Sequence, residues 1–292
     1  MQKKETSEFS RSDLACERRP TGSPSSDSRT VTRDSHGFTL TETVIEGDDH
    51  YPSGRYVTAS VGKVWLESQE RIDSLVNMLA EELSALVKHH TPDVPEEQLC
   101  IMVAGLGNRF ITADSLGPLC VDKLTVTGHM MGSGGIFDTL GCKKICAVQP
   151  GVLGQTGIEA AEIIKGAAEA ARPHIVIAID ALAARSTERL ASTIQISDSG
   201  IRPGSGIGNR RLAVSRDTVG CPVIAVGVPT VVNSSTLVWD ALEMADIDDI
   251  NPSLHGVLEN GRSFFVSPKE SDVISEEWSS ILASAIDTLA GL

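Results

Sequence analysis

The sequence predicts an α/β fold with a mostly parallel central sheet and helices on both faces. Three short, almost continuously apolar runs at 99–104 (LCIMVA), 175–179 (IVIAI) and 222–228 (PVIAVGV) are typical of strands buried on both faces. A helical segment separates the first two runs, and this order of elements favours parallel pairing. A chain of 292 residues can bury a core of this kind in one or two domains.

The remaining elements follow from apolar periodicity. Strands with period-two alternation are expected at 38–45, 56–64 and 192–196. Amphipathic helices, with an apolar residue every three or four positions, are expected at 66–90, 157–171 and 275–289. Thr156 is the expected N-cap of the second helix.

The first 54 residues have a different composition and are expected to be loosely ordered. The stretch 21–36 (TGSPSSDSRTVTRDSH) is rich in Ser, Thr and Asp and almost lacks large apolar side chains. Such a segment cannot offset the conformational entropy that ordering costs. Residues 1–20 lack the apolar region of a secretory signal, so they do not direct export.

Composition also bears on partners and compartment. The net charge of −14 repels phosphate backbones, so nucleic-acid binding is not expected. No apolar run approaches the roughly 20 residues that cross a bilayer, which predicts a cytoplasmic protein without membrane contact. Three of the six cysteines lie in apolar contexts, which favours buried thiols in a reducing compartment over disulfides.

Acidic side chains follow two of the predicted central strands. Asp114 lies in the segment after the 99–104 strand, and Asp180 directly follows the 175–179 strand. Sites in open α/β sheets form beyond the carboxyl ends of the strands, so the two carboxyl groups are candidates for acid–base chemistry. For a single strand-end aspartate, capping of the following helix is an equally good interpretation.

Other motifs are weaker, and no cofactor or metal is expected. The glycine-rich stretches 105–108 (GLGN) and 204–209 (GSGIGN) each lack the rest of a nucleotide-binding pattern. Cys142 and Cys146 have no second Cys/His pair at a zinc-site spacing, so buried thiols are favoured. His129 is a possible acid or base in a glycine-rich stretch, and neither Ser186 nor Ser205 has an obvious histidine partner.

Several longer segments resemble the germination proteases of spore-forming bacteria. The matching segments are RSDLACE (11–17), GRYVT (54–58), GLGNRFITADSLGP (105–118), PGVLGQTGIEAAEIIKG (150–166), IVIAIDALAARSTERLASTIQISDSGIRPGSGIGNRR (175–211), CPVIAVGVPTVV (221–232) and SPKE (267–270). The resemblance implies an aspartic-type endopeptidase that begins the degradation of small acid-soluble spore proteins during germination. It also implies a fold similar to that of hydrogenase maturation peptidases, a homotetrameric zymogen and a location in the spore core.

The resemblance carries site residues onto this chain. Asp114 and Asp180 correspond to the catalytic pair that would activate water. The polar residues Asn108, Ser197, Asp198 and Ser205 are expected to shape the substrate cleft. RSDLACE matches the family's processing region and points to the Asp13–Leu14 bond, with Glu8–Phe9 as the alternative bond. The implied organisation is a propeptide at 1–13, a flexible region at 14–54 and an α/β peptidase domain at 55–292.

The sequence departs from the family pattern beside Asp114 and near the C-terminal third. Arg109, Phe110 and Ala113 differ from the family's residues, and the region 244–265 is shorter than usual. Three alternative functions stay open: a processing peptidase with one partner protein, a non-catalytic scaffold and a nucleotide-binding enzyme. Retention of both aspartates argues against the scaffold, and the incomplete glycine patterns argue against nucleotide binding.

Overall fold

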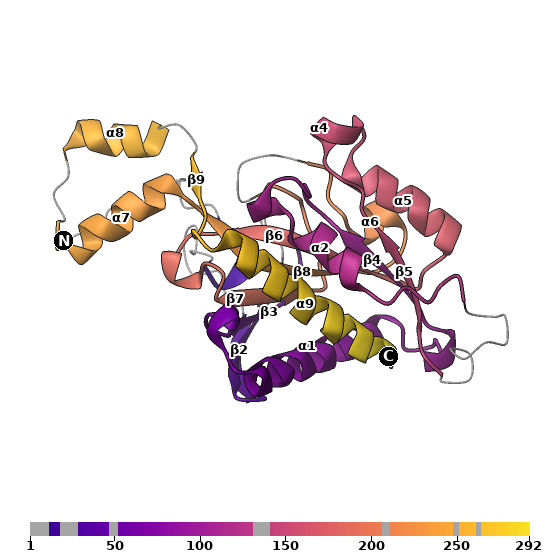
Figure 1. The fold of residues 1–292 in the computed structure, drawn as a ribbon. Helices are drawn as coiled ribbons and strands as arrows, with labels where there is room; N and C mark the ends of the chain where they lie inside the picture. Colours follow the sequence, from indigo (N-terminus) through magenta and orange to yellow (C-terminus); the bar gives the residue numbers. More distant parts are fainter. Residues whose placement is uncertain are drawn as a thin grey trace.

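Nine strands form one mixed sheet in the part of the chain that the computed structural model describes, residues 12–17, 29–46, 52–130, 141–205, 211–247, 251–260 and 264–292 (Figure 1). The strand order is β1-β2-β3-β7-β8-β6-β4-β5, and β9 pairs with β8. The strands are β1 (Arg29–Ser35), β2 (Phe38–Ile45), β3 (Gly54–Ser60), β4 (Cys100–Gly105), β5 (Lys144–Val148), β6 (Ile175–Ala184), β7 (Thr193–Ser197), β8 (Val223–Asn233) and β9 (Phe265–Val266).

The centre of the sheet is parallel, as the apolar runs predict. The strands β5, β4, β6 and β8 pair in parallel, and every residue of β4 is buried. Both β6 and β8 are longer than expected, because they continue to pair beyond the apolar runs as far as Ala184 and Val232. The α/β fold class with a parallel core is therefore confirmed.

The other half of the sheet is antiparallel and includes part of the region expected to be loosely ordered. The strand at Phe38–Ile45 is confirmed as β2, but Arg29–Ser35 forms β1 instead of a flexible stretch. His36 and Gly37 join them with φ angles of 50° and 77°, which suits the tight two-residue hairpin turn of twisted strands. Although β1 buries no residue, its ladder to β2 and its β-branched side chains hold it in the sheet.

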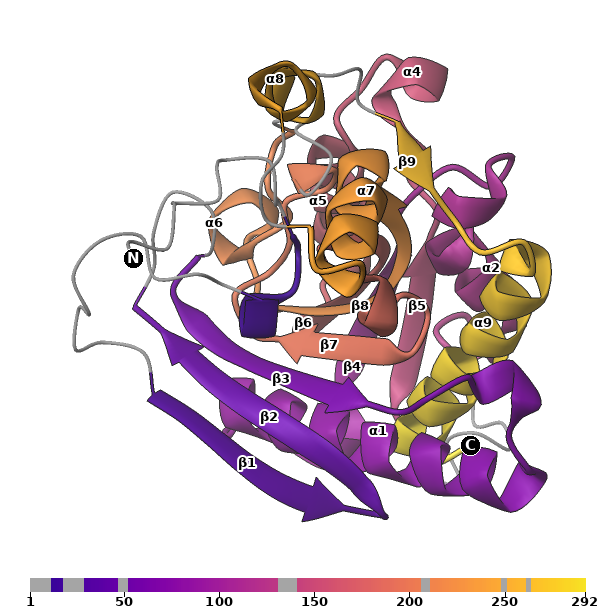
Figure 2. The same ribbon diagram turned by 90° about the vertical axis from the view of Figure 1, so that its left-hand side faces the viewer.

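Helices cover both faces of the sheet, as predicted. On one face lie α1 (Gln69–His90), α2 (Leu116–Lys123) and α9 (Ser271–Ala290), whose apolar sides share the main core with the sheet, and Figure 2 shows α1 and α9 side by side. The buried Trp278 of α9 donates a hydrogen bond from its Nε1 to the carbonyl of Ala191 (3.0 Å). On the other face, α5 (Ala160–Ala171) and α6 (Arg216–Val219) cover a smaller core.

Some boundaries differ from the sequence expectations. The helix predicted at 157–171 is confirmed as α5, which begins at Ala160 after Glu159. Thr156 is the last residue of a separate short helix, α4 (Leu153–Thr156), and does not cap α5. The helices α7 (Ser234–Met244) and α8 (Pro252–Asn260) extend away from the sheet beside β9 (Figure 1). Short 3-10 turns are η1 (Ala15–Glu17), η2 (Val64–Leu66), η3 (Glu96–Gln98), η4 (Thr112–Asp114) and η5 (Thr187–Arg189). None of the helices described is both long and apolar enough to cross a membrane.

Candidate active site

Asp180 lies inside β6, next to the centre of the sheet. Its neighbour on β8 is Gly227, and only 5% of the residue is exposed. The backbone N–H of Ala181 donates to its Oδ1 (2.9 Å). Burial raises the pKa of Asp180 well above its usual range, and the negative charges of Asp114 and Asp13 raise it further. Asp180 therefore keeps its proton more strongly than an ordinary aspartate does.

Asp114 reaches the same place from the segment after β4. It ends the short turn η4, and the backbone N–H of Asn108 donates to its Oδ2 (2.8 Å). Gly107 has a φ of 106°, and a Cβ there would lie 2.1 Å from the Asp114 carbonyl oxygen, so this loop requires glycine. The Thr230 hydroxyl on β8 donates to the carbonyl of Ala113 (2.6 Å) and fixes the turn. Burial raises the pKa of Asp114 from 3.8 to about 6.

Residues 12–17 dock on the sheet beside this pair. The Asp13 N–H donates to the carbonyl of Ala183 (3.0 Å), and the Ala183 N–H donates back to Oδ2 of Asp13 (2.9 Å). The Ser205 hydroxyl donates to Oδ1 of the same carboxyl group. The Asp13 carboxylate thus adds a third acidic group, bound to β6, and its negative charge helps to raise the pKa of Asp180.

The next residue, Leu14, is fully buried. It packs against the side chains of Leu182, Ala184 and Val232, with 0% exposure. Complete burial of a leucine contributes about 2 kcal/mol relative to an exposed one, so this side chain anchors the segment strongly. The Asp13–Leu14 bond therefore joins a residue held by polar contacts to one held by an apolar pocket.

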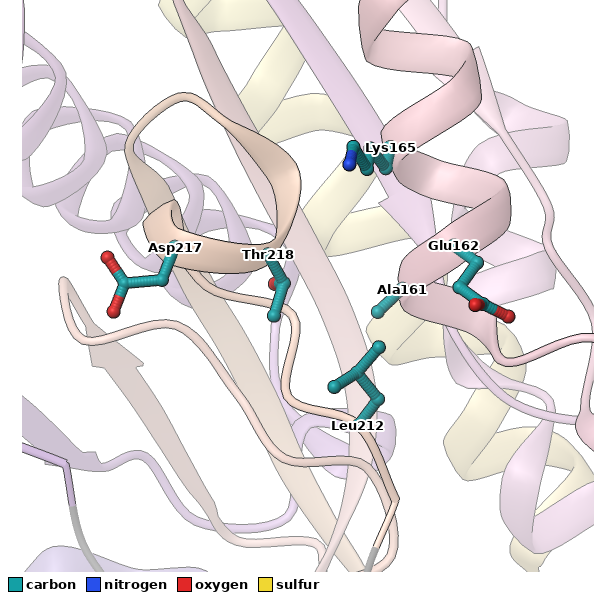
Figure 3. A pocket seen from close by; sticks show the side chains of 6 residues that line it. All are labelled: Ala161, Glu162, Lys165, Leu212, Asp217 and Thr218. Atoms are coloured by element: carbon teal, nitrogen blue, oxygen red, sulfur yellow. The ribbon is translucent and has the colours of Figure 1, made fainter.

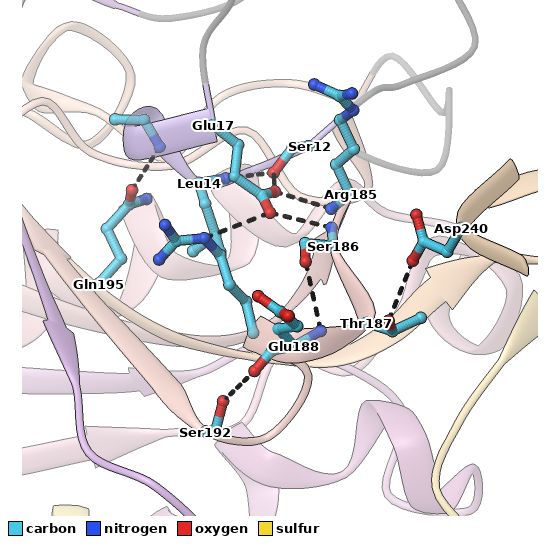
Figure 4. A network of polar contacts seen from close by, with 12 residues as sticks. Ser12, Leu14, Glu17, Arg185, Ser186, Thr187, Glu188, Ser192, Gln195 and Asp240 are labelled. Atoms are coloured by element: carbon cyan, nitrogen blue, oxygen red, sulfur yellow. Dashed lines mark hydrogen bonds and ion pairs between the residues drawn. The ribbon is translucent and has the colours of Figure 1, made fainter. Parts of the chain in front are cut away.

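Glu17 provides a second anchor, shown in Figure 4. Its carboxylate accepts hydrogen bonds from the backbone N–H groups of Arg185 (2.7 Å) and Ser186 (2.9 Å), and from the Ser12 hydroxyl. The Arg189 guanidinium lies 3.5 Å away. Charged hydrogen bonds of this kind contribute about 1.5–3 kcal/mol each, so Glu17 fixes the docked segment at the end of the turn η1.

The four residues expected to shape the cleft have different positions. Asn108 lies beside Asp114, and its Oδ1 accepts a hydrogen bond from Gln155 Nε2 (2.8 Å). Ser205 contacts Asp13 directly. Ser197 lies farther along β7 and hydrogen-bonds to Ser199 (3.3 Å).

Asp198 contacts β3 and α1. Its Oδ1 accepts from the backbone N–H of Arg55 (2.7 Å), and His90 Nε2 lies 3.5 Å from its Oδ2. Asp198 directly follows β7, and its carboxylate lies near the C-terminal end of α1 through His90. Its contacts tie β7 to β3 and α1 and do not reach the aspartate pair.

The departures beside Asp114 mostly point away from it. Arg109 forms an ion pair with Asp122 (2.6 Å), and Phe110 is 85% exposed. Ala113 takes part through its carbonyl, which accepts from Thr230. The alternative processing bond, Glu8–Phe9, lies outside the described residues, as does part of the shortened region 244–265.

Sequence reasoning missed three residues at this site: Glu17, Gln195 and Thr230. Gln195 donates from Nε2 to the Asp13 carbonyl (2.9 Å), and its Oε1 accepts from the Ala15 N–H (2.7 Å). A signal for Gln195 was present, since it is the polar residue of an alternating strand and therefore faces away from Ile194 and Ile196. Glu17 and Thr230 carry no such signal, because each acts through backbone groups distant in sequence.

A separate depression lies between α5 and α6, and neither Asp114 nor Asp180 lines it (Figure 3). It is lined by Ala161, Glu162, Lys165, Leu212, Asp217 and Thr218. Among the described residues, no cluster of three or more His, Cys, Asp or Glu side chains could hold a metal ion. Cys142 donates to the Gly291 carbonyl (3.1 Å) and Cys146 is hydrogen-bonded to Cys100, so the two cysteines of the C-x3-C motif have different partners.

Comparison with known proteins agrees with the resemblance noted in the sequence. The family model described as "Germination protease" matches residues 34–246. The chain is 40% identical over 258 residues to the germination protease of Clostridium acetobutylicum. The matched stretch covers 80% of this chain and 77% of that relative. It is 45% identical over 190 residues to the germination protease of Bacillus subtilis, over 65% of this chain and 51% of the relative. The chain therefore belongs to the germination protease family and is a peptidase.

Proposed function

We propose that this protein is an endopeptidase of small acid-soluble spore proteins that uses Asp114, Asp180 and a water molecule, and that it is made as a precursor that cleaves its own N-terminal segment. The observation that carries the proposal is the docking of residues 12–17, which hold the Asp13–Leu14 bond against β6, the strand that carries Asp180.

The two aspartates have different roles in the proposed mechanism. Asp180 is the more buried and lies near two other carboxylates, so it retains the proton and acts as the acid. Asp114, with a pKa raised to about 6, is ionised at neutral pH and acts as the base that takes a proton from water. The pair as a whole can hold one proton, which is the state required for acid and base to act together.

The segment around Asp13 is held as a substrate would be. An acidic side chain is bound by Ser205 and the Ala183 N–H, and the following apolar side chain fills the pocket at Leu182. A tethered segment has a high effective concentration at the site, so it blocks other substrates until it is cut. Cleavage after Asp13 releases the Asp13 carboxylate from the site and frees the Ser205 hydroxyl and the Ala183 N–H that bind it.

The test is incubation of the full chain near the pKa of Asp114, about 6, followed by N-terminal sequencing and addition of a small acid-soluble spore protein. We expect a new terminus at Leu14 and fragments of the added protein, both absent from the Asp180→Asn variant. Asp93→Asn, which changes an exposed carboxylate on the same chain, should behave as wild type.

Two outcomes would contradict the proposal. Full cleavage by Asp180→Asn would remove Asp180 from the mechanism, and an unchanged Met1 terminus in an active enzyme would remove the precursor. A single cut in one partner protein, with the spore protein left intact, would favour a processing peptidase instead.

We further propose that the enzyme acts in the spore core as a homotetramer without binding nucleic acid. The family resemblance supports the assembly, and the net charge of −14 opposes contact with phosphate backbones. Sedimentation at micromolar concentration, with and without duplex DNA, tests both statements. A 31.0 kDa species alone would contradict the tetramer, and co-sedimentation with DNA at physiological salt would contradict the second statement.

A further inference from the structure

We propose that Gln195 is a catalytic residue of the self-cleavage reaction, whose side-chain amide polarises the carbonyl of the bond that breaks. The inference rests on the proposed function, since it takes Asp13–Leu14 as the cleaved bond. Gln195 is not among the site residues that the family resemblance implied.

The first observation is the position of Gln195 in the sheet. On β7 it pairs with Gly227 of β8, and Gly227 pairs with Asp180 of β6, so the three residues form one row across adjacent strands. In-register neighbours direct their side chains to the same face, so Gln195 shares the face of Asp180. Adjacent strands are about 4.8 Å apart, which places the two Cα atoms roughly 10 Å apart with the docked segment beside them.

The second observation is that the amide contacts both sides of the Asp13–Leu14 bond. Its Nε2 donates to the carbonyl oxygen of Asp13 (2.9 Å), and its Oε1 accepts from the N–H of Ala15 (2.7 Å). A carbonyl can only accept and a backbone N–H can only donate, so these partners determine which amide atom faces which. Gln195 thereby directs an N–H group at the carbonyl oxygen of the bond to be cut.

The third observation is burial. Gln195 is 7% exposed, and the strand residues on either side of it belong to the apolar core. A buried amide costs free energy unless its groups are paired, and here both pairings are with the segment. A donor in such a poorly solvated place interacts more strongly with developing negative charge than one in water.

The chemical step makes use of this donor. Water oxygen bonds to the carbonyl carbon of Asp13, one water proton passes to Asp114, and the carbonyl oxygen becomes negatively charged. The N–H of Gln195 already points at that oxygen and stabilises the charge. The carbon–nitrogen bond to Leu14 then breaks, and the departing nitrogen takes the proton of Asp180. The amide of Gln195 neither gains nor loses a proton.

The experiment compares Gln195→Met and Gln195→Glu with wild type in the full chain. Methionine keeps the length of the side chain but cannot donate, so self-cleavage should slow by about 10²–10³, the usual cost of losing one such donor. Glutamate cannot donate when ionised, but its protonated form has one O–H donor and one acceptor, like the amide. The rate of Gln195→Glu relative to wild type should therefore recover as the pH falls, whereas that of Gln195→Met should not.

Two measurements separate catalysis from docking. Hydrogen exchange of the Asp13 N–H, which bonds to Ala183 and not to Gln195, reports whether the segment stays docked. It is measured in each variant combined with Asp180→Asn, so that the chain stays intact. We expect nearly unchanged protection in Gln195→Met. Gln98→Glu, an exposed site with the same change of side chain, is the matched control and should cleave as wild type.

The inference is overturned if Gln195→Met cleaves within a few-fold of wild type, or if its loss of rate equals its loss of exchange protection. A flat pH profile for Gln195→Glu relative to wild type would also contradict it. Failure of the proposed function gives a different result. A wild-type chain that cleaves neither itself nor an added spore protein refutes the proposed function and the role of Gln195 together. An active wild type with an equally active Gln195→Met refutes only the role of Gln195.

Discussion

Replacement of Asp114 by asparagine should stabilise the protein at neutral and alkaline pH while it abolishes cleavage. The side chain is nearly isosteric, and an asparagine Oδ1 can still accept the hydrogen bond from the Asn108 N–H. What the substitution removes is a carboxylate whose ionised form is disfavoured by burial.

The magnitude follows from the pKa of Asp114, which folding raises from 3.8 to about 6. Each pH unit by which folding moves a pKa corresponds to about 1.4 kcal/mol, so the ionised carboxylate costs at most about 3 kcal/mol. Water at the partly exposed side chain screens some of this energy. Because a raised pKa means that the folded state binds the proton more tightly, the wild type loses stability as the pH rises from about 4 to 6.

The assay is thermal unfolding of intact chains at pH 8 and at pH 4, with mass spectrometry to verify that no sample has been cut. For a chain of this size, a gain of 2–3 kcal/mol raises Tm by roughly 5–10 °C at pH 8. Little gain is expected at pH 4, where the wild-type carboxyl group of Asp114 is protonated in the folded state. Asp93→Asn, with the same change of net charge, should leave Tm unchanged. An equal or lower Tm for Asp114→Asn at pH 8, or an equal gain at both pH values, would refute the reasoning.

Three further predictions concern the docked segment and the turn before α2. Leu14→Ala deletes most of a fully buried side chain and should weaken docking of the segment by about 2–5 kcal/mol. Hydrogen exchange of the Asp13 N–H should therefore accelerate at least tenfold, and unchanged exchange would contradict the role of the pocket that receives Leu14. Glu17→Gln replaces one carboxylate oxygen by an NH₂ group, which faces one of the two backbone N–H donors of Arg185 and Ser186 and cannot accept from it. Self-cleavage, followed by release of the N-terminal fragment, should therefore slow about tenfold or more, and a wild-type rate would show that the anchor is dispensable. Thr230→Val removes the hydroxyl that donates to the Ala113 carbonyl. The substitution should lower kcat by about tenfold with a small change in KM, because the turn that carries Asp114 loses this contact. An unaltered kcat would show that this hydrogen bond does not position Asp114.

The difference between β6 as predicted and as observed shows how the site arises. The apolar run ends at Ile179, so sequence reasoning places Asp180 just beyond a strand. In the structure β6 continues to Ala184, because β8 pairs with it along that whole length. The extension presents the backbone N–H and carbonyl of Ala183 to which Asp13 binds, so the docking site depends on strand pairing and not on local composition.

The sequence by itself determined the α/β class and the three central strands, and it pointed to Asp114 and Asp180 as candidate site residues. It could do so because a strand buried on both faces must be apolar at every position, and a carboxyl group directly after such a strand is conspicuous. The amphipathic helix at residues 69–90 could also be predicted, because the spacing of its apolar residues matches the helical repeat.

Only the tertiary structure decided which polar groups meet at the site. Asp13 and Gln195 are far apart in the chain, and their contact depends on the position of β7 in the sheet and on the pocket that receives Leu14. Asp198, which the sequence suggested as a cleft residue, contacts the Arg55 N–H of β3 and lies beside His90 of α1, and both partners are distant in sequence. Residue type shows what a side chain can do chemically, but its partners are set by strand order, register and face, which are properties of the whole sheet.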